Sequence, residues 1–151
     1  MTVEELHIEL QKRNISDDKY YLQGLYGSTN DEDKIALNIK MGKYVAEYEV
    51  YYKERDEKHS ERTFTAENDA CEYILNKILE QTTIEKVQSI VGLDGMTVNE
   101  RLYASGLMDE FDKTKRKNKT RATQILRILR VDKPSIDKIL NKKTGGNTVY
   151  N

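Results

Sequence analysis

Two consecutive runs of alternating residues restrict the fold of this chain more than any other feature of its sequence. In residues 35–41, apolar side chains occupy every second position, with small or polar side chains between them. Residues 44–53 return to a period of two after Gly42. Because successive side chains of a strand point to opposite faces, the pattern predicts two strands that each bury one face, with a turn at the glycine.

A polar segment and a third strand follow directly. Residues 54–60 are all polar or charged, which is typical of a hairpin tip, and residues 61–65 then return as a strand. The change to period two already begins at Tyr20 and Leu22. The sequence therefore predicts an antiparallel meander of three to four strands.

Helices are predicted on both sides of this meander. In residues 3–13, apolar side chains recur at helical spacing, and Thr2 with Glu5 matches a capping box. A second helix begins at Thr65 or Asn68, and its broad apolar face should pack on the sheet.

The rest of the chain contains no further alternating run. Residues 84–91 have helical spacing, and a second capping box, Thr97 with Glu100, opens the next helix. The inward-facing residues of that helix are predicted to be Leu102, Tyr103, Leu107, Met108 and Phe111.

Two shorter helices fit residues 120–130 and 134–141. The predicted fold class is α+β, an antiparallel three- to four-stranded meander with flanking helices, followed by a C-terminal helical segment. We expect a sheet domain in residues 1–81, a helical module in residues 82–143 and a flexible tail in residues 144–151.

The formal net charge of −1 conceals an uneven distribution of charge. Residues 1–80 carry 18 acidic and 11 basic side chains, whereas residues 81–151 carry 8 acidic and 14 basic side chains. An acidic surface can meet a basic partner such as a nuclease cleft, and a basic segment can meet phosphate. Either charge can equally serve solubility or docking between the two halves.

Sequence features of secretion and of membrane insertion are both missing. The chain begins with acidic residues, where a signal peptide needs basic and then apolar ones, and no apolar run approaches the roughly 20 residues of a membrane span. The lone Cys71 has no partner for an internal disulfide and no zinc-site spacing around it. We therefore expect a cytoplasmic protein.

Few residues in the chain are suited to catalysis. His7 and His59 are the only histidines, and no motif places either beside a nucleophile. A dyad of Cys71 with a histidine stays open, because such pairs form in space rather than in sequence. We predict a binding protein rather than an enzyme, with no cofactor and no metal.

Tyrosine is the most unusual residue type, with ten in the chain against two Phe and no Trp. On the long strand, Tyr44, Tyr48 and Tyr52 are predicted to pack under the covering helix. The alternate residues should lie on the open side of the sheet, where tyrosine with carboxylates makes a plausible protein-binding surface.

The acidic loop at Asp31 lacks the spacing of a calcium loop, which indicates either a solvated loop or a contact region. The candidate partner-binding residues are Asp31, Glu32, Asp33, Glu47, Glu49 and Tyr51.

A basic run in residues 113–119 supports a different candidate function. Lysine and arginine clustered at a helix end can neutralise several phosphates of a nucleic acid. The same cations can instead form a solvated linker or offset the helix dipole. The alternative nucleic-acid-binding residues are Lys115, Arg116, Lys117, Lys119 and Arg121.

Two segments carry a resemblance to known proteins. Residues 67–75, with the sequence ENDACEYIL after a Thr-Phe-Thr strand, resemble the start of the sheet-covering helix of small bacterial immunity proteins. Residues 96–113, with the sequence MTVNERLYASGLMDEFDK, resemble a C-terminal helical module that recurs behind toxin-immunity and related accessory domains. Together the two segments cover roughly the region 60–140.

The resemblance is to the immunity proteins of contact-dependent growth inhibition and other polymorphic toxin systems. It implies a cytoplasmic protein that binds a cognate toxin C-terminal domain and blocks its active site or its access to substrate. Because such toxins are frequently nucleases, the resemblance also offers a reason for the acidic N-terminal half. It implies no catalytic residues, and it leaves open which face binds and whether the chain self-associates.

Overall fold

The computed structural model describes residues 1–141, and the chain forms two compact units. The first unit ends at Ile78 and the second begins at Leu79, within the 22-residue helix α2 (Glu67–Gln88). The sequence placed a boundary after residue 81. The tail predicted for residues 144–151 lies outside the described residues, as do the last two residues of the predicted helical module. The α+β class is confirmed.

The first unit is built on a five-stranded sheet in the order β2-β1-β3-β4-β5. Its strands are β1 (Tyr20–Leu22), β2 (Tyr26–Gly27), β3 (Lys34–Met41), β4 (Ala46–Glu54) and β5 (Glu57–Phe64). The last three strands form the predicted antiparallel meander, with Leu37 opposite Val50 and Tyr48 opposite Phe64. The prediction that residues 54–60 are all hairpin tip is wrong, because β5 begins at Glu57. The register places the apolar positions of all three strands on one face.

The two short strands extend the sheet beyond the predicted meander. β1 pairs with β3 in parallel and with β2 in antiparallel orientation, which makes a mixed sheet of five strands instead of three to four. The close pairing of β1 and β2 requires glycine at position 27. A Cβ on Gly27 would lie 2.4 Å from the Tyr20 carbonyl oxygen, and the φ of Gly27 is +80°. The period of two at Tyr20 and Leu22 indicated β1, whereas the two residues of β2 are too few to show a period in the sequence.

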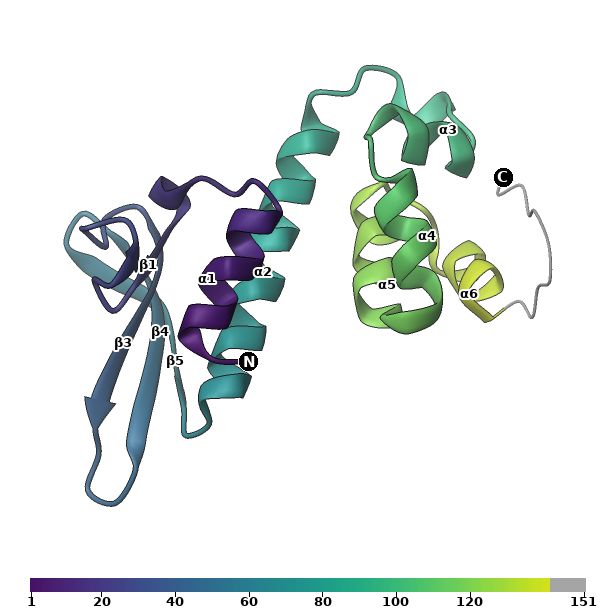
Figure 1. Cartoon of the computed structure of the whole chain (residues 1–151). Helices are drawn as coiled ribbons and strands as arrows, with labels where there is room; N and C mark the ends of the chain where they lie inside the picture. Colours follow the sequence, from purple (N-terminus) through teal and green to yellow (C-terminus); the bar gives the residue numbers. More distant parts are fainter. Residues whose placement is uncertain (142–151) are drawn as a thin grey trace. The chain divides into compact units, whose positions relative to one another are not determined.

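Helix α1 (Val3–Lys12) and the first part of α2 cover one face of this sheet (Figure 1). Leu6 and Leu10 from α1 and Ile74 from α2 are completely buried there against Leu37 and Val50. Thr2 caps α1, since its Oγ1 accepts a hydrogen bond from the Glu5 backbone N–H at 3.1 Å, which is one half of the predicted capping box. The other face of the sheet carries no helix of this unit (Figure 1).

The second unit is helical and has its own core. After the end of α2 it contains the short 3-10 turn η2 (Leu93–Gly95) and the helices α3 (Val98–Ala104), α4 (Met108–Lys117), α5 (Lys119–Ile128) and α6 (Lys133–Asn141). The largest side chains that are almost completely buried in this core are Leu102, Leu107, Phe111, Ile125 and Leu126.

The helix predicted to run from Thr97 through Phe111 is in fact two helices. The capping box is present, with Thr97 Oγ1 accepting from the Glu100 N–H at 3.2 Å and the Glu100 carboxylate accepting from the Thr97 N–H. Gly106, with a φ of +71°, then ends α3. Within α3, Leu102 is buried while Tyr103 is 82% exposed, so the prediction that Tyr103 faces the core is wrong.

Candidate functional site

The face of the sheet opposite α1 and α2 carries three of the six predicted partner-binding residues, Glu47, Glu49 and Tyr51. Eight of the side chains on this face form a set that we call the open face. They are Ala36, Asn38 and Lys40 of β3, Glu47, Glu49, Tyr51 and Lys53 of β4, and Lys58 of β5. Strand pairing places side chains of opposite charge next to each other. The net charge of this face therefore cannot be read from any one strand in the sequence.

Glu49 is held between two lysines from the neighbouring strands. Its carboxylate accepts from Lys40 Nζ at 2.6 Å and from Lys58 Nζ at 2.8 Å. The side chain of Glu49 is only 14% exposed as a result. These charge-assisted hydrogen bonds hold the pKa of Glu49 below its usual value, the bond from Lys40 having the largest effect. The three charges form a row across β3, β4 and β5.

Tyr51 connects the open face to the acidic loop before β3. Its Oη donates to Asp31 Oδ2 at 2.6 Å and accepts from Asn38 Nδ2 at 3.1 Å, while Lys58 Nζ lies 4.4 Å from the ring centroid. The hydrogen bond from Tyr51 is also the main reason why the pKa of Asp31 is lowered. Lys53 adds an ion pair to Asp31 at 3.3 Å.

This arrangement corrects one sequence-based expectation and qualifies others. Tyr51 lies on the predicted face but is 2% exposed, so the expectation that its ring offers contact area to a partner is wrong. The side chains of Lys58 and Asn38, from the two neighbouring strands, cover the Tyr51 ring. The alternating pattern of a single strand does not reveal such cover. Glu32 accepts a hydrogen bond from the Asp56 backbone N–H, whereas Asp33 is exposed and Glu47 is half-buried at the start of β4.

The tyrosines on the other side of β4 are also only partly as predicted. Tyr48 packs against the core of the first unit, but Tyr52 is 40% exposed. Tyr44 does not belong to the strand at all and is 85% exposed. The strand begins at Ala46, so the run of alternating residues in the sequence is longer than the strand it predicts.

Sequence reasoning predicted the turn between β3 and β4 at Gly42 but missed the exposed apolar side chains around it. Met41, Tyr44 and Val45 are 82%, 85% and 51% exposed, and we call residues 41–45 the hairpin tip. In Figure 1 the loop lies at the bottom of the first unit, at the far end of β3 and β4. Three large apolar residues around a glycine were the available signal, but the alternating pattern assigned Met41 and Tyr44 to the buried face of the strands and Val45 to the opposite face.

The basic run forms the end of α4 and the beginning of α5 instead of a linker. Asn118 separates the two helices, and its Oδ1 accepts from the Arg121 backbone N–H at 3.1 Å. Lys115 pairs with Asp112 at 3.3 Å. The exposed cations, which we call the basic junction, are Lys113, Arg116, Lys117 and Lys119.

Arg121 has a structural position, so its prediction as a nucleic-acid contact is wrong. The residue is 6% exposed, and its guanidinium binds both carboxylate oxygens of Glu110, at 3.0 and 3.1 Å. It also donates to Thr83 Oγ1 at 2.8 Å and to Gln124 Oε1 at 2.6 Å. The guanidinium thereby ties α4 and α5 to the end of α2 and is not accessible to phosphate.

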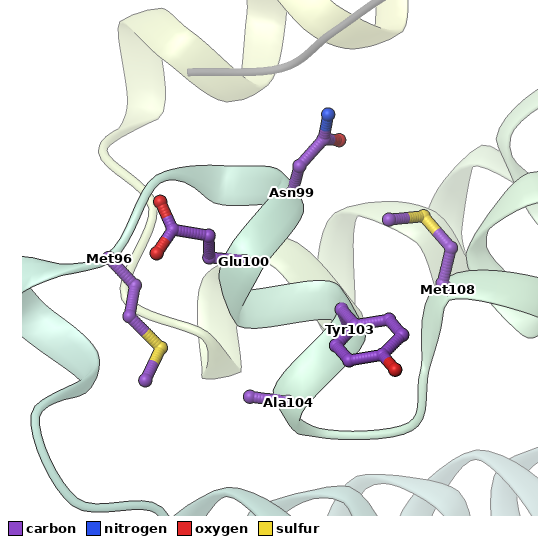
Figure 2. Close-up of a pocket in the computed structure, with 6 residues that line it drawn as sticks. All are labelled: Met96, Asn99, Glu100, Tyr103, Ala104 and Met108. Carbon is purple, nitrogen blue, oxygen red and sulfur yellow. The ribbon is translucent and has the colours of Figure 1, made fainter.

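A shallow hollow of about 510 Å³ is present on the helical unit around α3. Figure 2 shows its lining residues, which are Met96, Asn99, Glu100, Tyr103, Ala104 and Met108. The two methionines and the tyrosine make its surface largely apolar. Glu100 belongs to the capping box of α3 and is therefore committed to the fold.

The residues considered for catalysis lie on three different elements. His7 of α1 places Nδ1 2.8 Å from Tyr20 Oη, and the Tyr20 hydroxyl donates to Asp17 Oδ1 at 3.1 Å. Burial, followed by the contact with Asp17, raises the pKa of Tyr20 to about 12. His59 is exposed on β5. Cys71 of α2 is fully buried, and burial raises the pKa of its thiol to about 11.

Residues 1–141 contain neither a metal-binding cluster nor a helix that could span a membrane. No three His, Cys, Asp or Glu side chains in this part of the chain gather as a metal ion would require. None of its helices has the length and apolar character needed to cross a membrane. No family model, curated protein or solved structure matches the chain.

Proposed function

We propose that the chain binds and neutralises a cognate bacterial toxin domain, using the sheet unit as its binding surface. The observation that carries the proposal is the open face, a sheet surface without a covering helix of its unit, on which Glu49 is fixed between Lys40 and Lys58. Fixed charges lose little freedom on binding and discriminate between partners. The resemblance of residues 67–75 and 96–113 to immunity proteins supports the same proposal.

The acidic character of the N-terminal half of the chain indicates which kind of toxin surface it would bind. Residues 1–80 have an excess of seven acidic side chains over basic ones. The pairing of Glu49 and Asp31 with lysines leaves Asp33 and Glu47 as the more available carboxylates among those predicted. A basic cleft on a nuclease toxin would be attracted by this field, which would speed association.

Co-expression tests the proposal directly. The C-terminal domain of the protein encoded just upstream, as the candidate toxin, is expressed with and without this chain in the same cytoplasm, and growth and co-purification are measured. We expect restored growth and a complex of equal stoichiometry. Glu47→Lys combined with Asp33→Lys should weaken the complex by about tenfold or more, and Asp137→Lys, a reversal on exposed α6, is the matched control. Toxicity that persists without any complex would refute the proposal.

A second candidate function is binding to nucleic acid through the basic junction. Its support is the presence of four exposed cations, Lys113, Arg116, Lys117 and Lys119, within seven residues of two consecutive helices. No acidic residue lies in the first turn of α5 to offset them. Phosphate contacts of this kind give affinity that falls steeply with salt and depends little on base sequence.

Fluorescence anisotropy with a mixed-sequence RNA and a DNA duplex, each at several salt concentrations, tests this alternative. Arg116→Glu with Lys117→Glu should remove binding, and the salt dependence of the wild type should correspond to about three phosphate contacts. Arg127→Glu on α5 is a control outside the junction. Binding that is unaffected by the double reversal would rule out the junction.

A further inference from the structure

The hairpin tip concentrates apolar surface in one place on the sheet unit. Eight large hydrophobic side chains are exposed in residues 1–141, and three of them, Met41, Tyr44 and Val45, lie within five residues. Scattered exposed apolar residues are ordinary, but a cluster on a projecting loop is typical of a contact site. Neither the open face nor the basic junction includes these residues.

The backbone of the tip is tightly constrained. The Gly42 N–H donates to the Val45 carbonyl at 2.9 Å and closes the loop. A Cβ on Gly42 would lie 2.7 Å from that carbonyl oxygen and 2.8 Å from Glu47 Oε1, so the position requires glycine. Because the loop is already closed, presenting its side chains to a partner needs little further ordering.

Charge distinguishes between the possible occupants. An anionic lipid surface attracts clustered positive charge. The tip itself contributes Lys43, whose Nζ lies 5.3 Å from the Tyr44 ring centroid, while the neighbouring Lys40 is paired with Glu49. The surrounding unit is acidic, with seven more carboxylates than cations in residues 1–80. The complementary occupant is a protein pocket with apolar walls and basic surroundings.

We infer that the hairpin tip is the anchor of the complex, inserting Tyr44 and Met41 into an apolar pocket of the toxin domain that is surrounded by basic residues. The inference rests on the proposed function and adds to it the contact that provides most of the affinity. Buried aromatic anchors commonly dominate such interfaces, while the charged rim sets orientation and association rate. The open face is this rim.

Calorimetric titration of the full chain with the purified toxin domain tests the inference. Tyr44→Ser should weaken binding on the order of 30-fold, and adding Met41→Ser should weaken it further. Tyr103→Ser is the matched control, because Tyr103 is 82% exposed against 85% for Tyr44 but belongs to the helical unit. Gly42→Ala retains every apolar side chain and disturbs only the loop, so it should also weaken binding. Circular dichroism checks that each variant is folded.

The outcomes separate the two proposals. If the wild type binds and Tyr44→Ser binds equally well, the anchor is refuted while the immunity proposal stands. If the wild type does not bind the toxin domain, both are refuted. Vesicles of phosphatidylcholine with phosphatidylglycerol and sedimentation of the free chain are measured in parallel. Lipid binding or self-association that Tyr44→Ser abolishes would reassign the tip to a membrane or to a second copy.

Discussion

The open face and the basic junction both contain dense charge, but they arrange it in opposite ways. On the open face, strand pairing sets Glu49 between Lys40 and Lys58, so positive and negative groups satisfy each other. At the basic junction, consecutive helical turns bring Lys113, Arg116 and Lys117 together with the same sign. The comparison shows that the charge of a segment and the charge it offers to a partner are different properties.

The largest effect on stability should come from Arg121, which belongs to the basic run in sequence but is paired with a carboxylate as on the open face. Arg121→Ala removes the partner of Glu110 and of Thr83 in a buried position, and we expect a loss of about 3 kcal/mol in the free energy of unfolding of the helical unit. Hydrogen exchange of the α5 amides measures it. Arg116→Ala, in the exposed junction, should change stability by about 0.5 kcal/mol or less. Equal losses in the two variants would mean that Arg121 is not a structural residue.

A smaller effect is expected from the hydroxyl at the centre of the open face. Tyr51→Phe removes one of the two side-chain donors to Asp31, leaving only Lys53, and leaves Asn38 without its acceptor, which should cost about 1–2 kcal/mol. The pKa of Asp31 should rise toward its ordinary value, because the bond from Tyr51 is the main cause of its lowering. A carboxyl titration followed by NMR measures this change, and Tyr52→Phe is the partly exposed control. An unchanged Asp31 titration would contradict the predicted connection.

The smallest effect should depend on pH. The pKa of Glu49 is lower in the folded chain than in the unfolded one, so its contribution to stability is complete above the unfolded pKa of about 4.3 and is lost as pH falls through the folded pKa. Glu49→Gln should therefore cost about 1 kcal/mol at neutral pH and progressively less in acid. Denaturant unfolding at several pH values tests this prediction, with Glu57→Gln as an exposed control. A constant difference across pH would exclude the two lysine contacts as its source.

The sequence predicted the long elements of the fold better than its short ones. Strands β3 and β4 followed from alternation, β5 followed from the polar segment before it, and the start of α1 followed from the capping residue Thr2. The parallel pairing of β1 with β3 was missed, because a period of two does not report the direction in which a strand pairs. Gly106, with its positive φ, divides one predicted helix into two. The break was not predicted because helical spacing of apolar residues does not report the backbone conformation of a glycine between them.

The candidate site was predicted less well than the fold, for a physical reason. Alternation placed Tyr51 on the correct face, but its exposure depends on side chains from three strands and a loop. Likewise, Arg121 continued a basic run in sequence while the fold paired it with Glu110. The exposure of a side chain and the partner of a charged group depend on tertiary contacts. The exposed side chains of the hairpin tip and the ion pairs of each charged residue therefore could not be predicted from the sequence.

The single buried thiol also gives the chain a native reporter of its own opening. Cys71 lies in the core between α2 and the sheet, and burial raises the pKa of its thiol to about 11. A thiol reagent in neutral solution should therefore react only in molecules whose sheet unit has transiently opened. Because the chain has no other cysteine, the labelling rate reads the protection of this one unit without engineering. A tightly bound partner should slow that rate in proportion to its occupancy.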